Sequence, residues 1–216
     1  MSVIVDTSGI ENLELIFERF PEAAAKAMSI AINTTVNDFV IPEARKDILA
    51  EVAFPEGYLD SSDKLGVRQY ATPQQLVAVV EARSRPTSLA RFVDAPAIPA
   101  IGARGPAGNV TVNVTVKPGV TTKLKRGFFV GLNSDNIGFA VRLRPGETFQ
   151  NFGKSTFQPI EIFKNEDPAK GRVFLLYGPS VDQVFRQVAD KIAPETEVKL
   201  EAEFVRVLAV TLGVNK

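Results

Sequence analysis

Residues 177–192, reading YGPSVDQVFRQVADKI, constrain the fold more than any other part of the chain. The apolar run 173–177 predicts a strand, and the Gly-Pro pair after it predicts a turn. Ser180 suits the N-cap of a helix, because its hydroxyl can accept a hydrogen bond from a free amide of the first turn. Apolar residues then recur at helical spacing: Val181, Val184, Phe185, Val188 and Ile192. The segment therefore predicts a strand, a tight turn and an amphipathic helix that packs on a sheet.

Helical patterns also occupy the beginning and the end of the chain. We expect a first helix over 10–20 and a long Ala-rich helix over 22–50, with Pro42 kinking or restarting it. Pro194 predicts the end or a kink of the helix that starts at Ser180, with 195–212 as a second helical segment. The predicted apolar stripe of that last segment is Val198, Leu200, Phe204, Val207, Leu208 and Leu212.

Between the helices the pattern favours strands. The segment 109–116, NVTVNVTV, alternates strictly and predicts a half-buried strand with its valines on one face. Those valines are Val110, Val112, Val114 and Val116. Further strands are predicted over 3–5, 65–70, 76–82, 127–132, 139–143, 160–163 and 173–177. The predicted class is α+β, with long N-terminal and C-terminal helices packed on a mainly antiparallel sheet. We expect one domain over 1–193 and a C-terminal helical extension over 194–216.

Composition excludes several kinds of chemistry. The chain has no His and no Cys, so it can form neither a Ser-His nor a Cys-His nucleophile pair. The same absence removes the usual ligands of structural zinc and any disulfide. We therefore expect no catalytic residue, no metal and no cofactor. The N-terminus does not resemble a signal peptide, and no apolar run is long enough to span a bilayer, so assembly inside a cell without membrane contact is the expectation.

A basic tract is the clearest candidate contact surface. No acidic residue occurs over 95–134, although the net charge of the chain is zero. The basic residues of the tract are Arg104, Lys117, Lys123, Lys125 and Arg126. Such a surface can contact DNA phosphates or the acidic surface of a protein partner. The alternative is a solvated sheet face whose charge is balanced elsewhere.

Two predicted loops contain residues that could bind a neighbouring subunit or a phosphate group. The segment 94–108, DAPAIPAIGARGPAG, predicts an extended arm whose Ile98 and Ile101 dock on a neighbouring subunit, or else a flexible surface loop. The segment 153–156, GKST, resembles the end of a phosphate-binding loop. Six residues separate Gly146 from Gly153, whereas that loop needs four, so we interpret this segment as a surface loop.

The order of several motifs resembles the phage minor tail protein Z family, the tail-completion proteins of long-tailed phages. The resemblance lies in an Ala-rich helix at 23–44, a Pro-Ala-Ile patch at 95–102, a GFFVG strand at 127–131 and the Gly-Pro-Ser helix at 177–189. It covers most of residues 10–193, and 195–216 looks like an added tail. The family tends to be strongly basic, whereas this chain is neutral.

The resemblance implies a tail-terminator or neck-like fold and a structural virion protein at the head-proximal end of a phage tail. Such a subunit forms a homo-oligomeric ring, commonly six-fold. Its partners would be the tail terminator, tail tube or head connector proteins, with non-specific contact to DNA in the lumen. Alternatives are an assembly chaperone or monomeric adaptor outside the virion, and a nucleotide hydrolase that uses Lys154 and Ser155. The interface residues we expect are Ile98, Ile101, Val110, Val112, Val114, Val116, Ser180, Val184 and Phe185.

Overall fold

The computed structural model describes residues 2–4, 13–94, 110–132, 136–148, 158–163 and 171–213. It mixes helices and antiparallel strands, so the predicted α+β class is confirmed. The chain divides into two compact units, which differs from the single domain predicted over 1–193. Unit 1 comprises Met1–Ile48, Gly57–Arg83 and Asp182–Lys216, and unit 2 comprises Leu49–Glu56 and Ser84–Val181.

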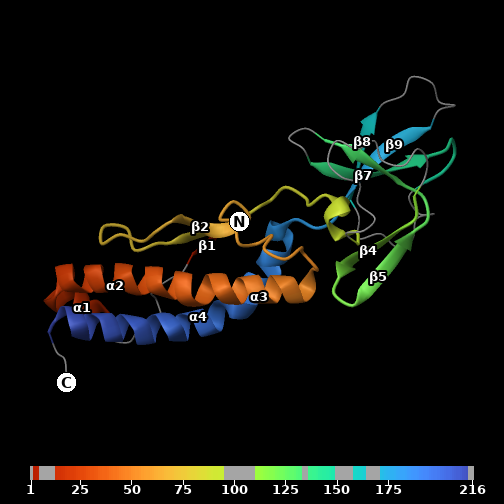
Figure 1. The fold of residues 1–216 in the computed structure, drawn as a ribbon. Coiled ribbons are helices and arrows are strands. Elements are labelled where there is room, and N and C mark those ends of the chain that lie inside the picture. The colour runs from red at the N-terminus through yellow and green to blue at the C-terminus, as the bar shows by residue number, and fades with distance from the viewer. Residues whose placement is uncertain are drawn as a thin grey trace. The chain divides into compact units, whose positions relative to one another are not determined.

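The helices of unit 1 come from opposite ends of the chain (Figure 1). They are α1 (Leu13–Arg19), α2 (Pro21–Thr35), the π-helical turn η1 (Val36–Val40), α3 (Ile41–Glu51) and α4 (Val181–Thr211). Lys191 Nζ of α4 pairs with Asp47 Oδ2 of α3 at 2.8 Å. Lys199 Nζ lies 5.7 Å from the centre of the Phe39 ring in η1. These two contacts show that α4 runs antiparallel to α3 and η1.

Small residues on one side of α2 allow the unit 1 helices to pack closely. Its buried positions recur at helical spacing, and they are Ala24, Ala27, Met28, Ser29, Ala31, Ile32 and Thr35. The predicted α4 stripe of Val181, Val184, Phe185, Val188 and Ile192 is also buried. Burying such apolar side chains contributes about 1.5–3 kcal/mol for each large one. Unit 1 therefore has a core made by residues that are far apart in the sequence.

Proline 42 changes the helix locally without ending it. Its nitrogen carries no hydrogen and cannot donate to the carbonyl one turn earlier. The preceding turn widens instead, so that the Ile41 amide donates to the Val36 carbonyl in a π-helical turn. We predicted that Pro42 kinks or restarts the helix. The structure shows a π-helical turn there, inside a longer helical run.

Proline 194 lies inside α4, which continues to Thr211. Of the two alternatives predicted for Pro194, an end or a kink of the helix, the end is wrong. The C-terminal extension over 194–216 stays a prediction. The proline removes one backbone hydrogen bond, but the turns on both sides keep their buried residues Ile192, Thr196 and Leu200. Their packing holds the helix together, because tertiary contacts outweigh local propensity.

Val198 was expected in the apolar stripe of α4, and this expectation is wrong, since the residue is 64% exposed. The buried positions in this part of the helix are Leu200, Phe204 and Val207, at spacings of four and three residues. Val198 lies on the opposite side of a helix with 3.6 residues per turn. Val205, 58% exposed, follows it one heptad later on that same outer side.

A small antiparallel sheet completes unit 1, with strand order β1-β3-β2. Its strands are β1 (Ser2–Ile4), β2 (Leu65–Gln69) and β3 (Val79–Ala82). Strand β3 is shorter than the strand predicted over 76–82. Asn33 of α2 ties an adjoining loop to the helices, because its side chain donates to the Ala71 carbonyl at 2.9 Å and accepts from the Ala71 amide at 2.8 Å.

Unit 2 contains the larger sheet, of four antiparallel strands in the order β6-β7-β9-β8. The strands are β6 (Phe128–Gly131), β7 (Ile137–Leu143), β8 (Gln158–Phe163) and β9 (Arg172–Tyr177). The predicted hairpin of β6 and β7 is confirmed, with Phe129 opposite Phe139. The rings of these two residues meet edge to face at 5.2 Å. Phe139, Val141 and Leu176 are buried on one face of the sheet, and Ala140, Val173 and Leu175 form a buried cluster on the other.

A separate hairpin and one short helical turn also belong to unit 2. The hairpin joins β4 (Val112–Lys117) to β5 (Val120–Leu124) through a turn at Gly119, whose φ is 74°. The short helical turn is the 3-10 turn η2 (Leu89–Phe92). The Ala53 amide donates to the Val116 carbonyl at 2.8 Å, which ties the segment after α3 to β4.

Candidate functional site

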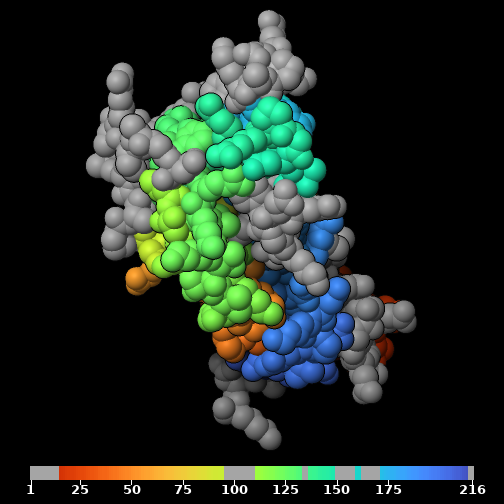
Figure 2. All heavy atoms as spheres, turned by 90° about the vertical axis from the view of Figure 1, so that its right-hand side faces the viewer, coloured from red at the N-terminus to blue at the C-terminus, as the bar shows by residue number. Residues whose placement is uncertain are grey.

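The β4–β5 hairpin presents a row of lysines to solvent. Val112 and Val114 are buried, and the alternation of the strand turns their neighbours outward. On that outer side Asn113 lies opposite Lys123, and Thr115 lies opposite Thr121. We call Lys123 and Lys125, both exposed on this outer side, the basic hairpin face. Lys117 is also exposed, but the register shift after Thr115 pairs it with Val120, which faces the other way from Lys123. Figure 2 shows the hairpin, in green, at the surface of the molecule.

Among the residues that the structure describes, neither lysine of the basic hairpin face has an ion-pair partner, and neither does Lys117. The hydroxyls of Thr115 and Thr121 lie 3.0 Å apart on the same side of the hairpin. The surface thus combines free ammonium groups with neutral polar groups. An acidic protein surface or a row of phosphates fits it chemically.

Arg126 differs from the lysines, because it is half-buried and paired within the chain. Its Nη1 lies 3.0 Å from Glu147 Oε1. The Arg144 amide donates to the same carboxylate at 2.8 Å. These two contacts, the Arg144 amide first and Arg126 second, hold the pKa of Glu147 below its usual value. Arg126 therefore stabilises a loop, and little of its charge is left for a partner.

The predicted interface valines are mostly buried inside their own chain. Val112, Val114 and Val116 are 2%, 1% and 8% exposed, and Val110 is half-buried. Their side chains fill the core of unit 2 and are not offered to a neighbouring subunit. The Val110 amide donates to the Gly127 carbonyl at 2.6 Å, so its backbone is also paired.

The predicted interface residues of α4 are buried as well. Ser180, Val184 and Phe185 are 2%, 6% and 0% exposed, so they hold the turn and the helix in place. The remaining predictions lie outside the described residues, and these are Ile98, Ile101, Arg104, Lys154 and Ser155.

A row of carboxylates on α4 is a candidate surface that sequence reasoning missed. Asp190, Glu197 and Glu201 are all exposed. Their spacing of seven and four residues puts them on one side of the helix. None of them has an ion-pair partner in the described part of the chain. We call these three residues the acidic helix row. A helical-wheel analysis of the charged positions, in addition to the apolar ones, would have found it.

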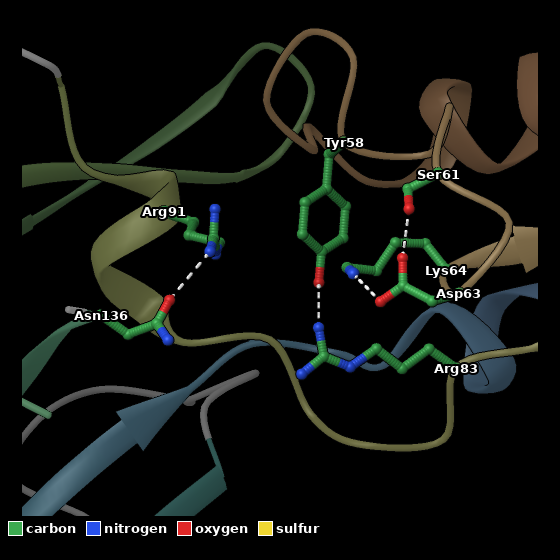
Figure 3. A network of polar contacts seen from close by, with 7 residues as sticks. All are labelled: Tyr58, Ser61, Asp63, Lys64, Arg83, Arg91 and Asn136. Atoms are coloured by element: carbon green, nitrogen blue, oxygen red, sulfur yellow. Dashed lines mark hydrogen bonds and ion pairs between the residues drawn. The ribbon is translucent and has the colours of Figure 1, made fainter. Parts of the chain in front are cut away.

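A cluster of polar contacts surrounds Tyr58 in unit 1 (Figure 3). Arg83 Nη1 donates to the Tyr58 hydroxyl at 3.4 Å, and Lys64 Nζ lies 5.7 Å from the centre of the Tyr58 ring. Asp63 accepts hydrogen bonds from Lys64 and Ser61, which lower the pKa of its carboxyl. The cluster pairs its own charges and fixes the loop before β2. Figure 3 also draws a contact of unit 2, in which Arg91 Nη2 donates to Asn136 Oδ1 at 3.3 Å.

The described residues contain no group of three or more Asp or Glu side chains arranged to hold a metal ion. Among the same residues, no helix combines the length and the apolar character needed to cross a membrane. The candidate surfaces are therefore the basic hairpin face and the acidic helix row, both of which are suited to binding by charge. Comparison with family models, curated proteins and solved structures found no match to this chain.

Proposed function

We propose that this chain is a structural subunit of a phage tail-completion or neck ring, located at the head-proximal end of the tail. The proposal depends chiefly on the ordered resemblance to the minor tail protein Z family. Its strongest part is the Gly-Pro-Ser segment, which here connects the strand β9 to the helix α4. In this role the chain contributes contact surface and carries out no reaction.

The exposed surfaces of the described residues support a role in assembly. The basic hairpin face and the acidic helix row carry charges without partners, and Val198 and Val205 are apolar side chains more than half exposed. Charged rows of this kind can bind an oppositely charged protein surface. The ring we propose is hexameric, and it joins the tail tube or tail terminator to the head connector.

Immunogold electron microscopy of particles from the phage that encodes the chain tests this proposal. We expect labels at the junction of head and tail, together with about six copies per particle by quantitative mass spectrometry, in keeping with closed symmetry. An antibody against an unrelated tail-tip protein is the matched control. If the chain is found on tails in the lysate but is missing from purified particles, it is an assembly chaperone and the proposal is wrong.

A further inference from the structure

A line of apolar residues runs along the side of α4 that faces away from the core of unit 1. Figure 1 shows α4, in blue, beside α2 and α3, and the side of α4 that packs on the core carries the fully buried Phe204. Successive residues of an α-helix are turned by about 100°, which defines the residues on the opposite side. They are Val198, Ala202, Val205 and Ala209. We call these four residues the outer seam.

The outer seam has the spacing of a coiled-coil contact. Its members follow one another at intervals of four, three and four residues, which are the a and d positions of a heptad. The first three members are exposed and Ala209 is half-buried. The seam is about 16 Å long, and its two alanines allow a second helix to approach closely. Towards the N-terminus it stops at Glu195 and Lys191, which are charged and exposed.

Opposite charges flank the outer seam on its two sides. Glu201 lies on one flank and Arg206 on the other, at the g and e positions that border such a contact. Both are exposed, and Glu201 has no ion-pair partner among the described residues. Arg206 binds Glu203 of its own helix through Nε and Nη2. A guanidinium carries more N–H groups than these two bonds use, so Arg206 can bind a second carboxylate.

We propose that the outer seams of two copies pack against each other as a parallel pair of helices. In this contact Glu201 of each copy pairs with Arg206 of the other, because g and e residues of successive heptads meet across a parallel pair. The contact has two-fold symmetry, so it contains this ion pair twice. In an antiparallel pair the e positions would face each other and bring Arg206 beside Lys199 of the other copy. Like charges across an interface are disfavoured, so the parallel direction is preferred.

A second copy is the partner that this surface fits. One helix supplies the apolar line and both charges, so the surface is complementary to itself. The contact is short, and we expect the chain to be a single copy at about 1 μM, with Val205 in water. The inference does not depend on the proposed function. Six copies arranged with D3 symmetry would contain three such pairs.

Two charge reversals in the full chain, Glu201→Arg and Arg206→Glu, test the ion pairs. Sedimentation equilibrium measures dimerisation up to about 1 mM protein. We expect the wild type to approach twice the 23.5 kDa mass of one chain as its concentration rises. Each reversal should raise the Kd of the dimer at least about tenfold, because both attractions become repulsions. An equimolar mixture of the two variants should restore the wild-type Kd, because each copy then faces opposite charges on the other.

An apolar position with a matched control tests the outer seam itself. Val205→Glu puts two like charges into the contact, and we expect it to abolish dimerisation. Val210→Glu is the control, since Val210 is 54% exposed on the same helix but lies outside the outer seam. It introduces the same charge and should dimerise like the wild type. Unchanged melting temperatures of the dilute variants, followed by circular dichroism, would show that they are folded.

A single cysteine tests the direction of the helices. The chain has no cysteine, so Val205→Cys provides its one thiol. In a parallel pair this position faces the same position of the other copy, at a separation that a disulfide can span. Oxidised glutathione is added as the oxidant of the two thiols. We expect a cross-linked dimer on a non-reducing gel for Val205→Cys and none for the control Val210→Cys.

Three results would overturn the inference. The first is a wild type that keeps the mass of one chain at about 1 mM, which would assign the outer seam to another partner or to none. The second is a mixture of the two reversals that dimerises no better than either variant alone. The third is cross-linking of Val205→Cys with Ala202→Cys but not with itself, which would mean an antiparallel pair. The proposed function fails separately, through absence of the chain from purified particles.

Discussion

The charged residues of the chain differ in how they are used, and the structure separates them where the sequence could not. Lys125 and Arg126 are adjacent and were both predicted to contact a partner. Lys125 is exposed and has no ion pair among the described residues, whereas Arg126 pairs with Glu147. That partner lies 21 residues further along the chain, so no local pattern reveals it.

The contact of Arg126 and Glu147 leads to a prediction about pH. The pKa of Glu147 is lower in the folded chain than the usual 4.5, so the contact stabilises the fold at neutral pH and above the usual glutamate pKa. This contribution is lost as the pH falls through the lowered pKa. NMR titration of the Glu147 carboxyl should show a midpoint below 4.5. In Arg126→Met the midpoint should rise only in part, because the Arg144 amide still donates. A midpoint at or above the usual value in the wild type would contradict this prediction.

Glycine 171 leads to a second prediction at this scale. Its φ is +70°, and a Cβ at this position would lie 2.2 Å from the Leu143 carbonyl oxygen. Gly119, with φ +74° and no atom within 4 Å of an added Cβ, is the matched control. We expect Gly119→Ala to cost about 1–2 kcal/mol of unfolding free energy, the usual cost of a left-handed conformation. Gly171→Ala should cost more, because the backbone of β7 or β9 must also move. Urea denaturation measures both, and equal losses would argue against the clash.

Among the elements, those set by local pattern could be predicted from the sequence. The alternating valines of 109–116 predicted β4, and the strand, turn and helix of 173–192 were predicted close to their observed bounds. The helix end predicted at Pro194 is wrong, because buried residues on both sides of Pro194 keep α4 continuous. The π-helical form of the turn before Pro42 could not be predicted, since it depends on how the helix adapts to the missing donor.

The buried and exposed sides of α4 can be tested at two adjacent positions. Phe204 is 0% exposed, and its neighbour Val205 is 58% exposed. Phe204→Ala should lower the unfolding free energy by about 3–5 kcal/mol, because it removes buried contacts and leaves a cavity. Val205→Ala should change it by no more than about 0.5 kcal/mol, because its side chain already lies in water. Urea denaturation, followed by the circular dichroism signal of the helices, measures both variants. Similar losses for the two would mean that the predicted sides of the helix are wrong.

At the scale of the whole molecule, the division into two units was beyond the reach of pattern analysis. Unit 1 combines three sequence segments, and more than a hundred residues separate α3 from α4. Its helices meet through contacts such as that of Asp47 with Lys191, which only the folded chain reveals. The same division explains why a net charge of zero was misleading. The acidic and basic residues balance over the chain as a whole, but not within either unit.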